Sequence, residues 1–312
     1  MTANSSSVAG RWAEVTRKEP CRACGRGDYC RASSDGAFLC RRGPFDGATE
    51  KQDKNGAPFW AGFPGGVTPT APTFEADTGP QPAPADQLDR VYRELLSHLT
   101  LSPEHREQML ARGFTADQVE VLGVKTLDQA ARQVAKRLAE MFPFLWQSVP
   151  GLYVKDGRPA LGGWTGLLIP CKDLQGRIIA LRIRADSSDA PRYSWLSSER
   201  HGGPGPGAPL SWWPGAGGQT EAVRVTEGEL KAALAALRTG IPTIACPGVG
   251  LFGGNQVLDW LLELGAARVI LTPDADFRTN PHVARAVCNA ITRLRSVPYP
   301  ITVEIWDQAG AQ

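Results

Sequence analysis

Two short, mostly apolar runs in the last third of the chain lead directly into acidic residues, and this pattern constrains the fold most. Residues 223–226 are followed by Glu227, and residues 267–273 are followed by Asp274 and Asp276. Runs of this length and composition are typical of buried parallel strands. Functional groups in an open α/β sheet lie just beyond the carboxyl ends of such strands, so we expect the three carboxylates to meet at one rim.

The surrounding sequence alternates between strand and helix patterns. The expected strands are 223–226, 242–246, 267–272 and 300–306, and the expected helices are 228–239, 254–264 and 281–296. Short connections between alternating elements predict a parallel sheet with helices on both faces. The expected fold class is therefore α/β.

Three carboxylates at one rim repel one another unless a cation joins them. Their hard oxygen ligands suit Mg²⁺ or Mn²⁺ and leave room for substrate phosphates, so Glu227, Asp274 and Asp276 predict a phosphoryl-transfer site. Lys231, one helical turn past Glu227, is placed to neutralise a triphosphate. The alternatives are that the acids are ordinary helix-start and turn residues and that Lys231 is a surface lysine.

These residues carry a resemblance to a known family. An acidic residue and a glycine after one strand, with Asp-x-Asp after a later strand, resemble the TOPRIM domain of bacterial primases, topoisomerases and several nucleases. Residues 226–232, Thr-Glu-Gly-Glu-Leu-Lys-Ala, resemble more specifically the TOPRIM domains of phage and plasmid primase-like proteins, and the match covers residues 150–306. The resemblance implies a TOPRIM-type sheet in which Glu227, Asp274 and Asp276 hold magnesium or manganese, with Lys231 among the catalytic residues.

Primase TOPRIM domains usually carry a further acidic pair shortly after the last strand. Here the chain passes Glu304 and Asp307 and stops at Gln312, so one of these two acids would have to help hold a second ion. We therefore expect the TOPRIM domain to be truncated at its C-terminal end, as the front of a longer polypeptide.

Seven cysteines divide unevenly along the chain. Cys21, Cys24, Cys30 and Cys40 have metal-ligand spacing, whereas the other three stand alone in apolar contexts. Four thiolates fit a structural, tetrahedral zinc site, and so small a module could not fold by hydrophobic burial alone. The residues between Cys30 and Cys40 predict a hairpin that turns at Asp35-Gly36. The spacing lacks the second Cys-x-x-Cys of bacterial primase zinc modules, and unligated thiols are the alternative.

Composition divides the chain into five parts. A zinc module at 1–54 is followed by a proline- and glycine-rich linker at 55–85, a helical segment at 86–150, a basic strand-containing subdomain at 151–218 and the TOPRIM domain at 219–312. The helical segment should begin at an Asp86 N-cap, continue with helices capped by Ser102 and Thr115, and end with a helix at about 127–141.

The basic subdomain carries the residues expected to contact substrate. Residues 166–170 and 178–184 predict two strands joined by a turn, and Arg182 and Arg184 alternate onto one face. Such arginines suit template phosphates or a nucleoside triphosphate, and an exposed strand face is the alternative. The run, with Pro191 and the two residues after it, resembles the basic subdomain that precedes TOPRIM in bacterial primases. The candidate nucleic-acid- and nucleotide-binding residues are Arg182, Arg184, Arg192, Tyr193 and Lys172.

One further stretch is expected to lie near the rim. Residues 201–218 are rich in glycine and proline, which predicts a surface loop. Its Trp212 and Trp213 are either packed beneath the loop or offered to bases.

The function that fits these features is that of a DNA primase, which makes short primers on a single-stranded DNA template from nucleoside triphosphates. Structural zinc would serve template recognition, and a replicative helicase in cis or in trans is a possible partner. The alternatives are a TOPRIM nuclease and a non-catalytic nucleic-acid-binding replication module. No apolar run is long enough to span a bilayer and the N-terminus does not resemble a signal peptide, so we expect a cytoplasmic protein.

Overall fold

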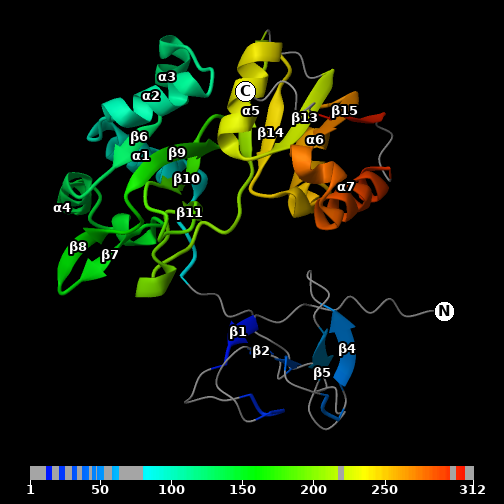
Figure 1. Cartoon of the computed structure of the whole chain (residues 1–312). Helices are drawn as coiled ribbons and strands as arrows, with labels where there is room; N and C mark the ends of the chain where they lie inside the picture. The colour runs from blue at the N-terminus through cyan, green and yellow to red at the C-terminus, as the bar shows by residue number, and fades with distance from the viewer. Residues whose placement is uncertain are drawn as a thin grey trace. The chain divides into compact units, whose positions relative to one another are not determined.

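The computed structural model describes residues 12–15, 21–24, 30–33, 37–41, 44–46, 48–52, 58–62, 80–216, 221–295 and 300–305. The chain forms two compact units, Met1–Asp77 and Thr78–Gln312 (Figure 1). None of the helices in the described ranges is long and apolar enough to cross a membrane.

The first unit is a small antiparallel sheet. Its strands are β1 (Trp12–Glu14), β2 (Arg31–Ser33), β3 (Phe38–Cys40), β4 (Ala48–Gln52) and β5 (Pro58–Gly62), in the order β1-β2-β3-β5-β4. Strands β2 and β3 form the predicted hairpin, although its turn at 34–36 lies outside the described residues. Among the described residues of this unit, three of the five in the buried cluster are cysteines. Sulfur atoms therefore form a large part of its described core.

The range expected to be a linker, 55–85, is not linker throughout. Strand β5 pairs with both β3 and β4, and α1 begins at the end of the same range. Phe59 and Trp60 are half-buried, so they supply apolar contacts that the surrounding proline and glycine residues obscured in the sequence. Residues 63–79 lie outside the described residues.

Helices open the second unit. They are α1 (Ala85–Ser97), α2 (Pro103–Ala111), α3 (Ala116–Leu122) and α4 (Val134–Met141). The Ser102 hydroxyl accepts a hydrogen bond from the His105 amide at 3.2 Å, and Thr115 forms a capping box with Gln118, which confirms both predicted caps. The predicted Asp86 cap is wrong, because Pro84 is the N-cap and Asp86 lies in the first turn.

The fourth predicted helix begins later than expected. Leu127 instead ends strand β6 (Lys125–Leu127), and residues 130–133 form a short 3-10 helix, η1 (Ala130–Gln133), before α4 starts at Val134. The Asp128 carboxylate accepts a hydrogen bond from the Ala131 amide at 2.7 Å and so caps the 3-10 turn. This local hydrogen bond therefore separates strand β6 from the 3-10 helix, within a stretch whose apolar residues recur with the period of a single helix.

An antiparallel sheet of four strands follows. Its members are β6, β9 (Gly166–Lys172), β10 (Ile178–Ala185) and β11 (Tyr193–Trp195), in the order β11-β10-β9-β6, and a separate hairpin joins β7 (Leu152–Lys155) to β8 (Arg158–Leu161). Leu168, Leu181 and Ile183 pack in one core with residues of α1 and α4. Leu167 and Ile169 alternate onto the opposite face, where they pack with residues of α2, α3 and α5.

The last sheet is the predicted parallel one. Strands β14 (Thr243–Cys246), β13 (Ala222–Glu227), β15 (Arg268–Thr272) and β16 (Ile301–Val303) are parallel neighbours in that order. Helix α5 (Glu229–Thr239) shares a core with one face. The helices α6 (Asn255–Glu263) and α7 (Pro281–Leu294) share a core with the other face, so both faces are covered as expected.

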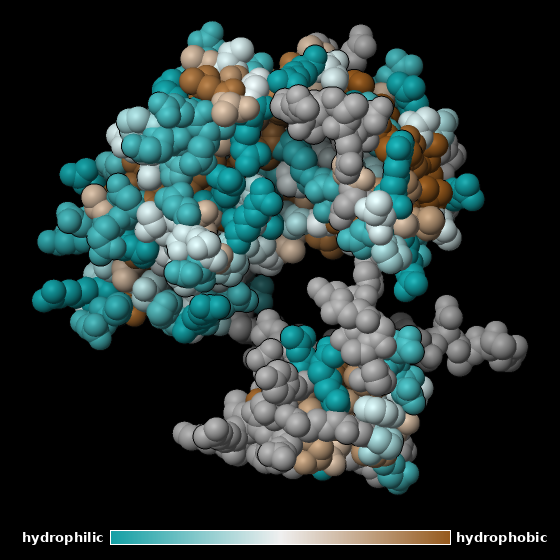
Figure 2. Space-filling view, in the orientation of Figure 1, coloured by the Kyte–Doolittle hydropathy of each residue, from teal (hydrophilic) through white to brown (hydrophobic). Residues whose placement is uncertain are grey.

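The expected loop at 201–218 contains a fifth strand of this sheet, β12 (Ser211–Trp213), which pairs antiparallel with β14. Trp212 and Trp213 are both buried, in the cores on the two opposite faces of the sheet. The structure therefore selects the packed alternative for the tryptophans. Figure 2 shows that the visible face of the second unit is mostly hydrophilic, with hydrophobic side chains gathered in small groups.

Candidate functional site

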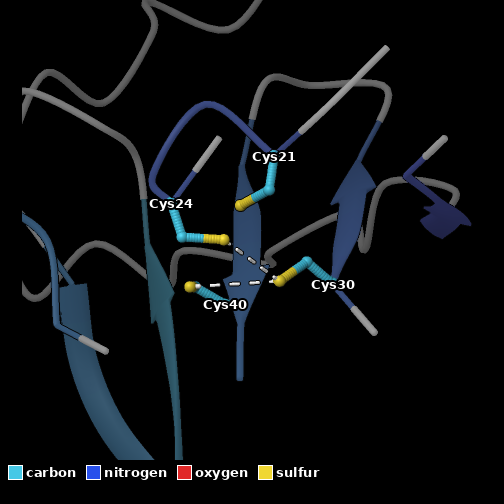
Figure 3. Close-up of side chains that lie close together, drawn as sticks. All are labelled: Cys21, Cys24, Cys30 and Cys40. Atoms are coloured by element: carbon cyan, nitrogen blue, oxygen red, sulfur yellow. Dashed lines mark hydrogen bonds between the residues drawn. The ribbon is translucent and has the colours of Figure 1, made fainter. Parts of the chain in front are cut away.

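The four clustered cysteines form one metal-binding arrangement. Their sulfur atoms all lie within 4.8 Å of one another, and the Cys30 sulfur is 3.7 Å from that of Cys24 and 4.0 Å from that of Cys40. Figure 3 shows Cys21 and Cys24 on one turn, facing Cys30 and Cys40. A tetrahedron with Zn–S bonds of about 2.3 Å has S–S edges of about 3.8 Å, so the arrangement fits zinc.

Burial shapes the chemistry of these thiols. The pKa of Cys30 is raised to about 12, mainly by burial and also by the neighbouring thiols Cys24, Cys21 and Cys40, while a hydrogen bond from the Arg41 backbone acts to lower it. Buried thiolates this close together are therefore unfavourable without a cation. A bound Zn²⁺ would supply the positive charge that lets the thiols lose their protons.

Two acids of the predicted rim, Glu227 and Asp274, lie where two adjacent strands end. Glu227 is the last residue of β13, and Asp274 follows the neighbouring strand β15 by two residues. Gly228, with φ of 77°, turns the chain sharply from β13 into α5, a conformation that favours glycine. Asp276 belongs to the short 3-10 helix η6 (Ala275–Arg278), but its side chain lies outside the described residues. Glu227 and Asp274 therefore leave neighbouring strands at the same edge.

Lys231 faces this rim, as predicted. Its Nζ donates a hydrogen bond to Oδ1 of Asp274, and both side chains are about half exposed. The Asp274 carboxylate is therefore paired with the ammonium group of Lys231 in this structure. Because both groups reach solvent, this ion pair contributes little to the stability of the fold.

Glu304, one of the two acids considered as a second-ion ligand, is engaged beneath the rim. It accepts hydrogen bonds from Arg224 Nε at 2.9 Å and from Thr272 Oγ1 at 3.0 Å. Burial acts to raise the pKa of Glu304, but the hydrogen bond and charge of Arg224, with the Thr272 hydroxyl, outweigh it, and this pKa is lowered. Asp307, the other candidate, lies outside the described residues.

Arg224 is the residue that pattern reasoning missed here. It lies on β13 inside the run interpreted as a buried strand, and it is 1% exposed. Besides Glu304, its Nη1 donates to Thr239 Oγ1 at the end of α5, at 3.0 Å. The signal available in the sequence was a single charged residue within a buried strand, because a buried charge needs an oppositely charged or hydrogen-bonding partner.

Arg182 joins the antiparallel sheet to the rim. Its Nη1 lies 3.6 Å from Oε1 of Glu229, the first residue of α5, and its guanidinium lies over the Trp195 ring at 4.5 Å from the centroid. Burial raises the pKa of Glu229, although the charges of Arg182 and Lys231 oppose the shift. Arg182 is therefore largely enclosed by an acid and aromatic rings rather than lying on an exposed strand face.

The other basic-face candidates spread outward from Arg182. Arg192 is exposed, with its guanidinium 5.9 Å from the centroid of Tyr193, and Tyr193 pairs with Arg184 across β10 and β11. Arg184 Nη1 donates to Gln108 Oε1 at 2.7 Å, and its side chain lines a cavity of about 500 Å³ with residues of α2. The structure thus groups Arg182, Arg192 and Tyr193, and it points Arg184 toward α2.

Lys172 is not grouped with these arginines. It is the last residue of β9, and its Nζ lies 5.3 Å from the ring centroid of Trp213. Lys172 lines a different cavity, near α1 and α3.

No protein-family model matches the sequence, and a search of curated proteins finds no match. Solved structures do resemble it. The zinc-binding and RNA polymerase domains of Aquifex aeolicus primase align with a TM-score of 0.55 and 18% identity, over 72% of this chain and 56% of that chain. The RNA polymerase domain of Mycobacterium tuberculosis primase DnaG aligns with a TM-score of 0.55 and 14% identity, over 71% and 76% of the two chains.

A DnaG primase catalytic domain bound to single-stranded DNA gives a TM-score of 0.51 at 15% identity, over 72% of each chain. At these identities the likeness establishes a shared fold. The expected resemblance to bacterial primases is therefore confirmed at the level of the fold.

Proposed function

We propose that this protein is a primase-like nucleotidyltransferase that makes short primers on single-stranded DNA. The observation that carries the proposal is the meeting of Glu227 and Asp274 at the ends of adjacent parallel strands, in a fold shared with primase catalytic domains. Fold alone does not specify chemistry, so the acidic rim is the decisive feature. We assign the parallel sheet to the TOPRIM type. We also propose that a phage or a plasmid encodes the protein.

The rim residues are suited to divalent cations. Glu227, Asp274 and Asp276 would hold Mg²⁺ or Mn²⁺, and the contact between Lys231 and Asp274 supports the fit because this carboxylate already accepts a cation. When bound, the ions supply activation of a 3′-hydroxyl and charge stabilisation for the leaving pyrophosphate. Lys231 would then turn from Asp274 to the triphosphate, where its charge opposes that of the phosphates.

The basic residues would position the substrates. Arg192 is exposed beside Tyr193, so it is available to template phosphates while the ring offers a surface for a base. Arg182, held between Glu229 and Trp195, would supply a fixed charge between this surface and the rim. Arg184 would support the template path from its contact with Gln108.

Structural zinc would hold the first unit in a form that recognises the template. Nucleoside triphosphates are the proposed co-substrates, and a replicative helicase is a proposed partner. A nuclease that uses the same acids with water as the nucleophile is the second candidate, because the carboxylates alone do not distinguish the two reactions.

The test is incorporation of labelled ribonucleotides on single-stranded DNA with Mg²⁺ or Mn²⁺. We expect short, metal-dependent products from the wild type, none from Asp274→Asn, and wild-type amounts from Asp259→Asn, a matched change on the exposed face of α6. Shortening of the template would favour the nuclease. Equal synthesis by wild type and Asp274→Asn would refute the proposed site.

A further inference from the structure

A second cavity lies at the opposite end of the antiparallel sheet from the cavity that contains Arg184. It has a volume of about 390 Å³ and is formed by α1, the end of α3, the start of β6 and the facing ends of β9 and β10. Figure 1 shows these elements grouped together in the second unit. The size lies within the range of small-molecule sites.

Three cations converge on this cavity. Arg93 comes from α1, Lys125 from the first position of β6 and Lys172 from the last position of β9. Among the described residues that line it, Glu120 is the one acid, and it is already paired with Arg106. The cavity therefore carries a net positive charge, which favours an anionic ligand.

The two lysines are not neutralised by ion pairs. Arg93 is held by Asp89 through both carboxylate oxygens, at 2.9 and 2.8 Å. Within the part of the chain that the structure describes, neither Lys125 nor Lys172 has a carboxylate within 4.0 Å. Their charge is thus available to a ligand.

Lys172 is the more unusual of the two. Its Nζ lies 5.3 Å from the ring centroid of the buried Trp213. Burial lowers the pKa of Lys172, the charge of Arg93 lowers it further, and Asp89 opposes the shift. A half-buried ammonium beside a second cation gains more from an anion than an exposed lysine does, because desolvation strengthens the interaction.

The other lining residues include aliphatic side chains. Leu96, Leu122, Pro170 and Ile178 are buried behind the cavity, and Val121 is exposed at its edge. Cations beside an exposed aliphatic side chain suit a ligand with an anionic group and a flat or apolar body. A nucleotide combines a phosphate with a base in this way, and its base would lie toward Val121.

We propose that the cavity lined by Arg93, Lys125 and Lys172 is a second ligand site, which binds a phosphate ester of mononucleotide size. The site is separate from the acidic rim, since neither Glu227 nor Lys231 nor Asp274 is among the described residues that line this cavity. It does not depend on the catalytic proposal. The phosphate belongs either to a free nucleotide or to one unit of a bound strand.

The experiment uses pyridoxal 5′-phosphate as the probe. Its phosphate mimics the ligand, and its aldehyde condenses with a lysine amine to an imine with loss of water, which borohydride then reduces to a stable amine. Peptide mass spectrometry of the full chain should find Lys172 labelled at least tenfold faster than Lys155, an exposed lysine on β7. Lys125→Ala should slow the labelling of Lys172 several-fold, and Lys155→Ala should not.

Competition identifies the source of the phosphate. AMP or a single-stranded oligonucleotide should protect Lys172, and whichever acts at the lower concentration marks the ligand as free or strand-borne. Asp274→Asn should leave the labelling and its protection unchanged, which separates this site from the rim. Labelling of Lys172 no faster than that of Lys155, or labelling that neither competitor reduces, would overturn the proposal.

Discussion

Replacement of Glu304 by alanine should destabilise the second unit strongly, because it leaves the Arg224 guanidinium buried without its carboxylate. The Arg224 side chain is 2% exposed and the Glu304 side chain is 41% exposed. Loss of one partner of a buried ion pair costs about 3–5 kcal/mol. Water can enter where the half-exposed Glu304 stood, so we expect the lower limit, about 3 kcal/mol, for this pair.

The reverse replacement should cost less. In Arg224→Met, the aliphatic side chain fills most of the space, and the Glu304 carboxylate is exposed enough to be hydrated. We expect a loss of about 1–2 kcal/mol for the missing hydrogen bonds. Arg224→Met combined with Glu304→Ala should cost little more than Arg224→Met alone, because no buried charge remains. The two single effects should therefore be non-additive by about 2 kcal/mol.

Thermal unfolding followed by calorimetry measures these differences. A loss of about 3 kcal/mol corresponds to a fall in Tm of about 6–12 °C for a unit of this size. Glu221→Ala, which removes an exposed acid just before β13, is the matched control and should change Tm by about 1 °C or less. Additive losses in the double variant, or equal losses from Glu304→Ala and Glu221→Ala, would refute the argument.

The same pair sets a pH dependence with a definite sign. The pKa of Glu304 is lowered in the folded protein from its ordinary value of 4.5. The stabilisation is therefore complete above about pH 4.5 and is lost as the pH falls through the folded pKa. The Tm difference between wild type and Glu304→Gln should shrink as the pH is lowered through this window.

Three further predictions concern the zinc module, the buried acid and the exposed arginine. Cys40→Ser should abolish the binding of one zinc per chain, measured by chelator-dye release, whereas Cys288→Ser on the exposed part of α7 should retain it. Burial raises the pKa of Glu229 above 4.5, so its ionisation costs stability as the pH rises; the Tm of Glu229→Gln relative to wild type should increase from pH 4 to pH 8, and a constant difference would contradict this. Arg192→Ala should reduce the slope of log K against log salt for single-stranded DNA by about 0.7, the amount for one phosphate contact, in a titration of binding against salt.

Hydrophobic periodicity predicted the parallel sheet, and capping residues predicted the start of two helices. The strands around β13 and β15 are short and apolar, the helices between them are amphipathic, and each connection is short, so few other arrangements bury these side chains. The caps at Ser102 and Thr115 were predictable because they depend only on residues three positions apart. Local features of this kind need no knowledge of the rest of the chain.

Contacts between distant segments were not predictable in the same way. Alternation within β10 correctly put Arg182 and Arg184 on one face, but it carried no information about Glu229, which belongs to a helix 47 residues further along. Lys172 was listed with these arginines, whereas in the structure it lines the separate cavity near α1 and α3. The pairing of β12 with β14 likewise buried tryptophans in a stretch whose composition indicated a loop.

Side-chain hydrogen bonds beneath the rim join the two strand ends that carry its carboxylates. Thr226 Oγ1 donates a hydrogen bond to the Thr272 carbonyl at 2.8 Å, so the last residues of β13 and β15 are joined by a side chain as well as by backbone. Thr272 Oγ1 in turn donates to Glu304. Glu227 and Asp274 follow directly from these tied strand ends. Lys231 donates to Asp274 from the first turn of α5, and both side chains are about half exposed. A metal ion at the proposed site would therefore meet carboxylates whose strand ends are already joined beneath them.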